Sequence, residues 1–124
     1  SNAGLSGCPL RSPYAASKWA AIGLAKTWAM ELGPWNIRVN ALCPGSVSGP
    51  RIEGVINRDA EARGMEADDI RRVYQRQGSL RQFTDPEDIA AMVSFLAGPG
   101  GKKVSGQAIA IDGHTESLAN WLDP

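Results

Sequence analysis

The chain has 124 residues, of which 43% are hydrophobic and 21% are charged, and its net charge at pH 7 is +0. This length allows one small domain with an ordinary apolar core. The balanced charge gives no electrostatic reason to expect a nucleic acid or an anionic membrane as partner, and no apolar run is long enough to cross a membrane.

The cysteine and histidine content makes disulfide and metal sites poor explanations. Cys8 and Cys43 have no disulfide-type framework around them, so we expect free thiols in a reducing cytoplasm. The single histidine, His114, has no cysteine or acidic cluster at ligand spacing and is expected in a turn or an interface. The sequence therefore predicts a cytoplasmic protein without a metal centre.

Residues 12–32 are predicted to form the first helix. Ser12 is expected as its N-cap, Pro13 suits the first turn, and Gly33 followed by proline ends the helix. Residues 1–11 are expected to form a loop that leads into it.

Tyr14 and Lys18 lie four residues apart in this helix, so both side chains emerge on one face. An ammonium group held beside a phenol favours the ionised phenol. Such a tyrosine is suited to acid–base chemistry near neutral pH. The pair alone equally describes a solvated helix face.

Two strands are predicted, at residues 37–43 and 107–112, from their β-branched and small apolar residues. In the first strand, Ile37 and Cys43 are expected on the same face. A strand directly after a long helix favours an α/β fold. Pro44 ends the first strand, at the carboxyl end where open α/β sheets bind ligands.

Residues 51–81 are mostly polar and are predicted to include helical pieces at 52–57 and 68–76. With few apolar side chains, the segment is expected to contribute little core, as a mobile cover or a solvated surface excursion. Its arginines permit an anionic substrate or form a solvated helix pair: Arg51, Arg58, Arg63, Arg71, Arg72 and Arg76.

A further helix is predicted before the second strand. The residues from Thr84 to Glu87 fit a capping box with proline at its start, and Gly98 ends the helix. After the strand, Leu118, Trp121 and Leu122 of the tail are expected to dock on a neighbouring element.

Five blocks, in this order, resemble the second half of short-chain dehydrogenases/reductases. They are Tyr14-Ala15-Ala16-Ser17-Lys18, Asn36-Ile37-Arg38-Val39-Asn40, Pro44-Gly45, Pro86-Glu87-Asp88-Ile89-Ala90, and Ser105-Gly106-Gln107 with Ile111-Asp112-Gly113. The resemblance implies that residues 1–124 are the C-terminal half of a Rossmann-like, doubly wound parallel α/β sheet, incomplete as a single chain.

The same resemblance implies a fragment of an NAD(P)-dependent oxidoreductase that interconverts an alcohol and a carbonyl. Tyr14 is implied as the catalytic acid/base, and Lys18 as its partner and a ligand of the nicotinamide ribose. The residues implied at the cofactor are Tyr14, Lys18, Pro44, Gly45, Ser46 and Val47, and those implied in the substrate loop are Ser48, Gly49 and Arg51.

The family's catalytic serine precedes the tyrosine by thirteen positions, which is Ser1 in this chain. Two explanations of Ser1 stay open. It is the native serine that polarises the substrate carbonyl, or residues 1–3 are the remnant of an expression tag that falls in register. A residue at a free N-terminus is expected to be poorly held.

The chain lacks the Gly-rich turn at which the family binds the pyrophosphate. We therefore expect NAD or NADP in an intact parent, with a small-molecule substrate, but neither bound dinucleotide nor activity in this chain alone. The alternative is a catalytically silent fragment that persists as an oligomeric or interaction module. Unsatisfied strand edges and apolar residues such as Trp19 and Trp28 predict a homo-oligomer.

Overall fold

The structure is a computed structural model that describes residues 1–119, so the expectations for Trp121 and Leu122 lie outside the described residues. Its elements, in chain order, are η1 (Asn2–Gly4), α1 (Ser12–Leu32), η2 (Gly33–Trp35), β1 (Ala41–Pro44), α2 (Pro50–Arg63), α3 (Ala67–Gln75), α4 (Pro86–Ala97), η3 (Pro99–Gly101) and β2 (Ala108–Ile111). The helix–strand–helix–strand order confirms the predicted α/β class.

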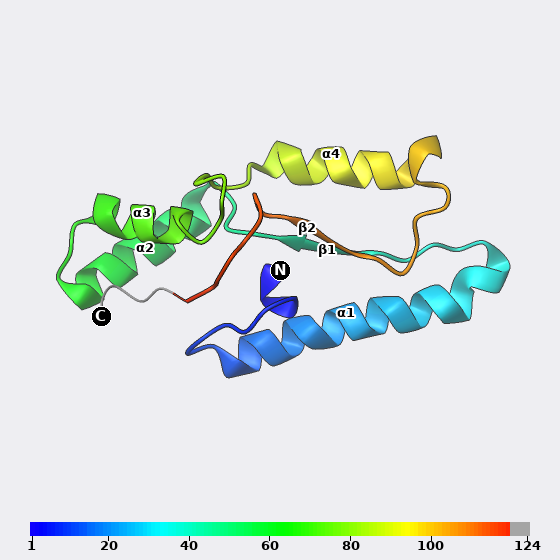
Figure 1. The fold of residues 1–124 in the computed structure, drawn as a ribbon, viewed down its shortest axis with the longest axis horizontal. Coiled ribbons are helices and arrows are strands. Elements are labelled where there is room, and N and C mark those ends of the chain that lie inside the picture. Colours follow the sequence, from blue (N-terminus) through cyan, green and yellow to red (C-terminus); the bar gives the residue numbers. More distant parts are fainter. Residues whose placement is uncertain (120–124) are drawn as a thin grey trace.

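The two strands pair in parallel, with Ala41 opposite Ala108 and Pro44 opposite Ile111. In Figure 1 the strand pair runs between α1 and α4, and α2 and α3 lie beyond the carboxyl end of β1. This arrangement places the loop after β1 among the start of α1, the N-terminal segment and α2. Any site at that strand end is therefore bordered by distant parts of the sequence.

Both strands are shorter than predicted, because side chains satisfy backbone groups of the residues that precede each strand. The Val39 amide donates to Ser105 Oγ at 3.1 Å, and Asn40 Nδ2 donates to the Val104 carbonyl at 2.9 Å. Ile37 is 48% exposed whereas Cys43 is 1% exposed. The apolar face predicted for the first strand is therefore buried only at its carboxyl end.

The N-cap of α1 is Arg11, so the expectation for Ser12 was wrong. Leu10 adopts a positive φ of 66°, which turns the chain just before the helix. As a result the Arg11 carbonyl already accepts the first helical hydrogen bond, from the Ala15 amide at 2.9 Å. Ser12 is then the first helical residue and does not cap.

A capping box opens α4, one residue later than predicted. Asp85 is the N-cap, and its amide donates to Asp88 Oδ2 at 2.8 Å. Thr84 is buried instead, and its hydroxyl donates to the Ile111 carbonyl at 2.8 Å. Because its hydroxyl is hydrogen-bonded to β2, Thr84 does not cap the N-terminal end of α4.

The main buried apolar cluster lies between α2 and α3, so the expectation of little core in residues 51–81 was wrong. Ile52, Ile56 and Ala60 recur every four residues along α2 and meet Ile70 of α3. Ile56 and Ile70 are fully buried. The segment has few apolar residues, but their spacing places them on one stripe.

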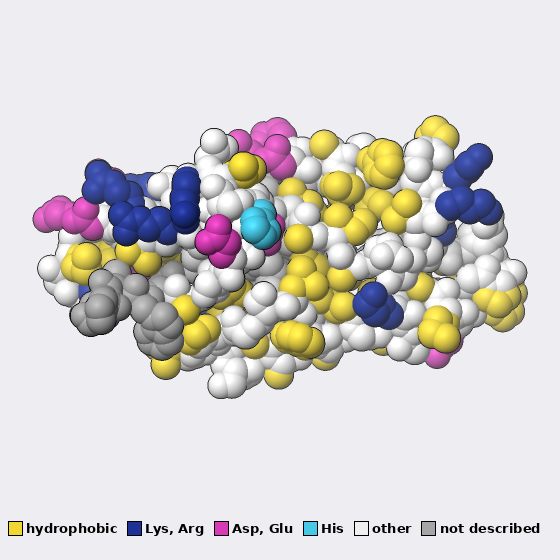
Figure 2. Space-filling model, in the orientation of Figure 1, with side chains coloured by type: hydrophobic (Ala, Val, Ile, Leu, Met, Phe, Trp, Pro, Cys, Tyr) yellow, Lys and Arg dark blue, Asp and Glu magenta, His cyan; other side chains and the backbone are white. Residues whose placement is uncertain are grey.

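Large apolar side chains are exposed along α1 and α4. Trp19 is 56% exposed and Trp28 is 46% exposed on α1, and Phe95 is 53% exposed on α4. Figure 2 shows hydrophobic side chains gathered between these two helices on the face in view. Among residues 1–119, no helix has the length and apolar character that a membrane span requires.

Candidate active site

A cleft of about 1140 Å³ opens at the carboxyl end of β1. The N-terminal segment, the start of α1, the loop after β1, and parts of α2 and α3 border it. Every residue that the sequence predicts at the site lines this cleft: Ser1, Tyr14, Lys18, Pro44, Gly45, Ser46, Val47, Ser48, Gly49 and Arg51. The fold thus brings together residues that lie up to 50 positions apart in the sequence.

Tyr14 and Lys18 lie on one face of α1, as their spacing predicts. The Lys18 ammonium nitrogen is 5.3 Å from the centroid of the Tyr14 ring, within the range of a cation–π contact. Ser17 Oγ donates to the Tyr14 carbonyl at 2.7 Å, which braces this first part of the helix. The ammonium therefore stays beside the phenol in the cleft.

The N-terminal segment packs tightly on α1, which corrects the expectation that Ser1 is poorly held. Asn2, Ala3 and Gly4 are buried. A Cβ on Gly4 would come within 2.8 Å of the Lys18 carbonyl oxygen and 2.7 Å of Ile22 Cδ1. Only glycine permits this approach, and it sets Ser1 on the cleft beside the helix that carries Lys18.

Asn2 holds the same segment to the end of β2. Its Nδ2 donates to Thr115 Oγ1 at 2.8 Å and to Asp112 Oδ2 at 3.3 Å. The side chain is nearly inaccessible, since Asn2 is 8% exposed. Sequence reasoning missed Asn2, because no local pattern links it to residues more than 100 positions away.

The loop after β1 is held by β2 and by Thr84. The Gly45 amide donates to the Ile111 carbonyl at 3.1 Å, and a Cβ on Gly45 would lie 2.8 Å from Asp112 Cβ. The Thr84 amide donates to the Ser46 carbonyl at 2.9 Å, and the Thr84 carbonyl accepts from the Ser48 amide at 2.8 Å. Close packing against β2 therefore accounts for glycine at position 45.

Val47 lies between the two loop residues that bond to Thr84. Its own N–H and C=O make no hydrogen bond within residues 1–119. One donor and one acceptor are thus left for a ligand in the cleft that Val47 lines. Gly49, at the end of the loop, has a φ of 140°, which L side chains rarely adopt, and it directly precedes α2.

Tyr74 of α3 is a cleft residue that sequence reasoning missed as a site residue. Its hydroxyl donates to Asp59 Oδ2 at 3.3 Å, and Asp59 Oδ1 accepts from Arg63 Nε at 2.6 Å. Burial raises the pKa of Tyr74, the negative charge of Asp59 raises it further, and the nearby Arg11 lowers it. Tyr74 is thus held protonated and cannot serve readily as a base.

The arginines of residues 51–76 divide between the cleft and the solvent. Arg51, Arg58 and Arg63 line the cleft. Arg71 pairs with Glu53 and Asp68, and Arg72 pairs with Asp69 at 2.8 Å, both as bridges on or between helices. The solvated helix pair is thus found at Arg71 and Arg72, whereas an anionic substrate at the cleft arginines stays a prediction.

The remaining candidate groups are one histidine and two cysteines, of which Cys8 lines the cleft. His114 is in the turn after β2, where its amide donates to Asp112 Oδ1 at 3.0 Å and its Nδ1 lies 3.0 Å from Ser79 Oγ. Cys8 and Cys43 are free thiols. Burial raises the pKa of Cys43, which makes it a poor nucleophile.

Comparison with known proteins decides the family. Residues 1–114 match a family model whose description is enoyl-(acyl carrier protein) reductase. The chain belongs to the short-chain dehydrogenase/reductase family. The match to the family model confirms the short-chain dehydrogenase/reductase family that the sequence motifs predict. The similarity to solved structures of this family confirms the Rossmann-like α/β fold.

Three relatives show how much of such a protein the chain covers. The 3-oxoacyl-[acyl-carrier-protein] reductase FabG of Thermotoga maritima is 39% identical over 110 residues, which are 89% of this chain and 40% of that protein. A short chain dehydrogenase family protein from Francisella tularensis is 30% identical with a TM-score of 0.86, over 91% of this chain and 47% of its own. A variant actinorhodin polyketide ketoreductase with NADPH is 30% identical with a TM-score of 0.84, over 98% and 45%. The chain spans less than half the length of each.

Proposed function

We propose that this chain carries the acid–base and substrate-binding part of an NAD(P)-dependent oxidoreductase that interconverts an alcohol and a carbonyl. The observation that carries the proposal is the shared cleft of Tyr14, Lys18 and the loop after β1. Family membership and the similarity to a ketoreductase with NADPH support it. Tyr14 is the acid/base, and Lys18 is its partner.

The donors and acceptors of the cleft fit the nicotinamide end of a dinucleotide. The Lys18 ammonium is a donor for ribose hydroxyls, and the unbonded N–H and C=O of Val47 match the acceptor and donor of a carboxamide. When bound, the dinucleotide supplies or accepts the hydride. The choice between NAD and NADP depends on a residue beside the adenosine ribose, and pyrophosphate binding depends on a Gly-rich turn; residues 1–124 contain neither motif.

Tyr14 handles the proton of the reaction. In the reducing direction the carbonyl carbon gains a hydride and the electrons of the C=O π bond move to the oxygen. The oxygen takes the phenolic proton, and the product is an alcohol. In the oxidising direction the phenolate takes the hydroxyl proton as the hydride leaves the carbon. Lys18, whose ammonium nitrogen lies 5.3 Å from the centroid of the Tyr14 ring, is the partner cation of this pair.

Ser1 is the third group at the cleft. Its Oγ accepts a hydrogen bond from the Ala3 amide at 3.1 Å, so the hydroxyl proton is left for a substrate oxygen. If Ser1 is native, it polarises the carbonyl that Tyr14 protonates. If residues 1–3 are a tag remnant, this role belongs to the residue that the native protein has at position 1.

The test is a comparison of Tyr14→Phe and Lys18→Ala in the full-length protein. Tyr14→Phe should lower turnover by about 10²–10⁴-fold and leave nucleotide binding by calorimetry intact. Lys18→Ala should weaken both. Lys26→Ala is the matched control on the same helix, because its ammonium bonds the Gly106 carbonyl outside the cleft. Wild-type turnover in Tyr14→Phe would remove Tyr14 from the mechanism.

A second candidate function is an assembly module without catalysis. The exposed Trp19 and Trp28 of α1 favour association with other surfaces. We propose on the same ground that the protein is a homo-oligomer. Light scattering coupled to size-exclusion chromatography tests the assembly, and a well-folded monomer would contradict it.

A further inference from the structure

The wall of the cleft on α2 is cationic. Arg51, Val55 and Arg58 are spaced by four and three residues, so they share one side of the helix, and all three line the cleft. Two of the three are arginines, and the apolar stripe of α2 packs instead on Ile70. The helix thus presents its guanidinium groups to the cavity that contains Tyr14.

Gly54 shapes the position of Arg58. A Cβ on Gly54 would lie 3.2 Å from Arg58 Nη1, so the guanidinium folds back along α2 over the bare backbone of the glycine. This direction leads toward the N-terminal end of the helix, where Gly49 ends the loop after β1. Arg58 lines the cleft, and its guanidinium lies over Gly54, four residues nearer the start of α2.

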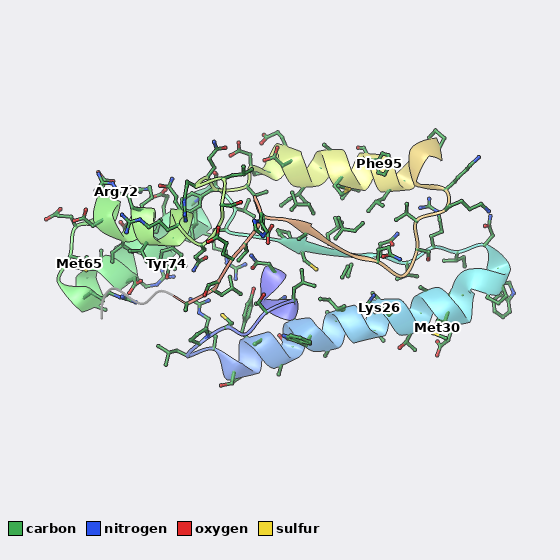
Figure 3. The ribbon with its side chains drawn as sticks, viewed as in Figure 1. Lys26, Met30, Met65, Arg72, Tyr74 and Phe95 are labelled. Atoms are coloured by element: carbon green, nitrogen blue, oxygen red, sulfur yellow. The ribbon has the colours of Figure 1, made fainter. Side chains whose placement is uncertain are left out.

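Ion pairing separates these arginines from those on the outer side. Arg71 and Arg72 are paired with carboxylates, and Arg72 projects from the outer side of α3 in Figure 3. Figure 2 shows cationic side chains gathered over this region. Among residues 1–119, Arg51 and Arg58 have no carboxylate within ion-pair distance.

The charge of the lining has one predominant sign. Asp59 is the one carboxylate among the lining residues that the structure describes, and it is already bonded to Arg63 and Tyr74. The cationic residues of the same lining are Arg11, Lys18, Arg51, Arg58 and Arg63. A concave surface with this imbalance concentrates anions.

We propose that the substrate carries an anionic group, a carboxylate or a phosphate, which binds Arg58 and Arg51 while the reacting oxygen lies at Tyr14. The inference rests on the proposed function, because it names the substrate class of that site. The planar guanidinium fork of Arg58 bonds two oxygens of either anion. These contacts are outside the bonds that change, so they contribute to binding and orientation.

Two matched substrate pairs test the proposal in the full-length protein. Acetoacetate is compared with methyl acetoacetate, and dihydroxyacetone phosphate with dihydroxyacetone, each with NADH and NADPH. In at least one pair, kcat/KM should be higher for the anion by about ten- to hundredfold, the worth of one or two charge-assisted hydrogen bonds. The pair with the larger ratio identifies the anion as carboxylate or phosphate.

Arg58→Gln should abolish this preference. It should raise KM for the anionic substrate by about tenfold or more, with kcat nearly unchanged, since the lost contact binds substrate and transition state alike. Turnover of the neutral partner should stay within about threefold. Arg58→Lys should restore part of the preference, because it keeps the charge without the fork. Arg72→Gln, outside the cleft, is the control and should change neither substrate.

The outcomes distinguish the inference from the proposed function. Turnover of neutral ketones without any anion preference, or with equal losses for both partners in Arg58→Gln, overturns the inference and leaves the oxidoreductase standing. Calorimetric binding of succinate or inorganic phosphate is a readout independent of turnover. Anion binding that is lost in Arg58→Gln supports the anion site. If the same protein reduces no carbonyl, the proposed function is overturned.

Discussion

Asn2 and Thr115 are joined by a 2.8 Å hydrogen bond from Asn2 Nδ2 to Thr115 Oγ1, across 113 positions of the sequence. The same amide group reaches Asp112 at the end of β2. One buried side chain therefore holds the segment that carries Ser1 against the strand that supports the loop after β1. The geometry of the cleft depends on this tie as well as on the residues that line it.

Replacing Asn2 by Ala should lower the free energy of unfolding by about 1–3 kcal/mol, because the nearly buried Asn2 side chain loses two hydrogen bonds to partly buried partners. Urea denaturation of the full-length protein measures the loss. Asn57→Ala, at an exposed position of α2, is the matched control and should change stability by less than about 0.5 kcal/mol. Equal effects of the two changes would show that the tie contributes nothing.

Gly4→Ala should both destabilise the protein and impair the site. The new Cβ would meet the Lys18 carbonyl and Ile22 Cδ1 below 3 Å, so the N-terminal segment must move away from α1. We expect a loss of about 1–3 kcal/mol and a lower turnover. Gly7→Ala is the control, since no atom lies within 4 Å of its Cβ position. Thermal unfolding and turnover of both variants decide the matter, and unchanged values in Gly4→Ala would refute the close approach.

Arg38→Gln should destabilise the end of α4. Arg38 Nη1 donates to the Leu96 carbonyl at 2.7 Å and to the Gly101 carbonyl at 2.8 Å, which satisfies acceptors at the end of α4 and in η3. The expected loss is about 1–3 kcal/mol. Arg72→Gln breaks an exposed bridge and should cost less than about 1 kcal/mol. In Arg38→Gln, amide hydrogen exchange should become faster mainly in α4. Exchange that becomes faster uniformly along the chain would contradict a local role of Arg38 at the C-terminal end of α4.

Cys43 should contribute a pH dependence of stability above neutrality. Burial raises its pKa above that of an unfolded cysteine, so the folded protein keeps the thiol proton at a pH where the unfolded chain loses it. Stability from this group is complete below the unfolded pKa of about 8.5 and falls as pH rises toward the folded pKa. Between pH 7 and 10, the free energy of unfolding measured in urea should therefore fall more steeply with pH for the wild type than for Cys43→Ala. Parallel pH profiles would mean that the thiol titrates alike in both states.

Local sequence patterns were sufficient for the shared face of Tyr14 and Lys18 and for most elements. Tyr14 and Lys18 share a face because a helix repeats every 3.6 residues, and the loop after β1 follows from its Pro-Gly sequence. The end of α1 and the class of the fold followed from the same kind of evidence. The family resemblance implied that the loop after β1 lies at one site with Tyr14 and Lys18, and all of these residues line the cleft.

Long-range contacts account for what the sequence missed. Thr84 was expected in the capping box at the start of α4, but its hydrogen bond to the Ile111 carbonyl holds it in the interior. The core of α2 and α3 was underestimated because the short apolar stripe of α2 that includes Ile56 is buried only when Ile70 of the next helix packs on it. Neither effect can be read from a window of neighbouring residues.

By itself, the sequence determined the helices, the strand pair and the common helix face of Tyr14 and Lys18, because hydrophobic periodicity, turn residues and motif spacing act over a few positions. Only the tertiary structure decided that Asn2 holds the N-terminal segment, that Gly4 and Gly45 must be glycines, and that Arg58 faces the cleft. These depend on atoms from distant segments that meet within 4 Å, and close packing rather than local propensity sets which side chains fit there.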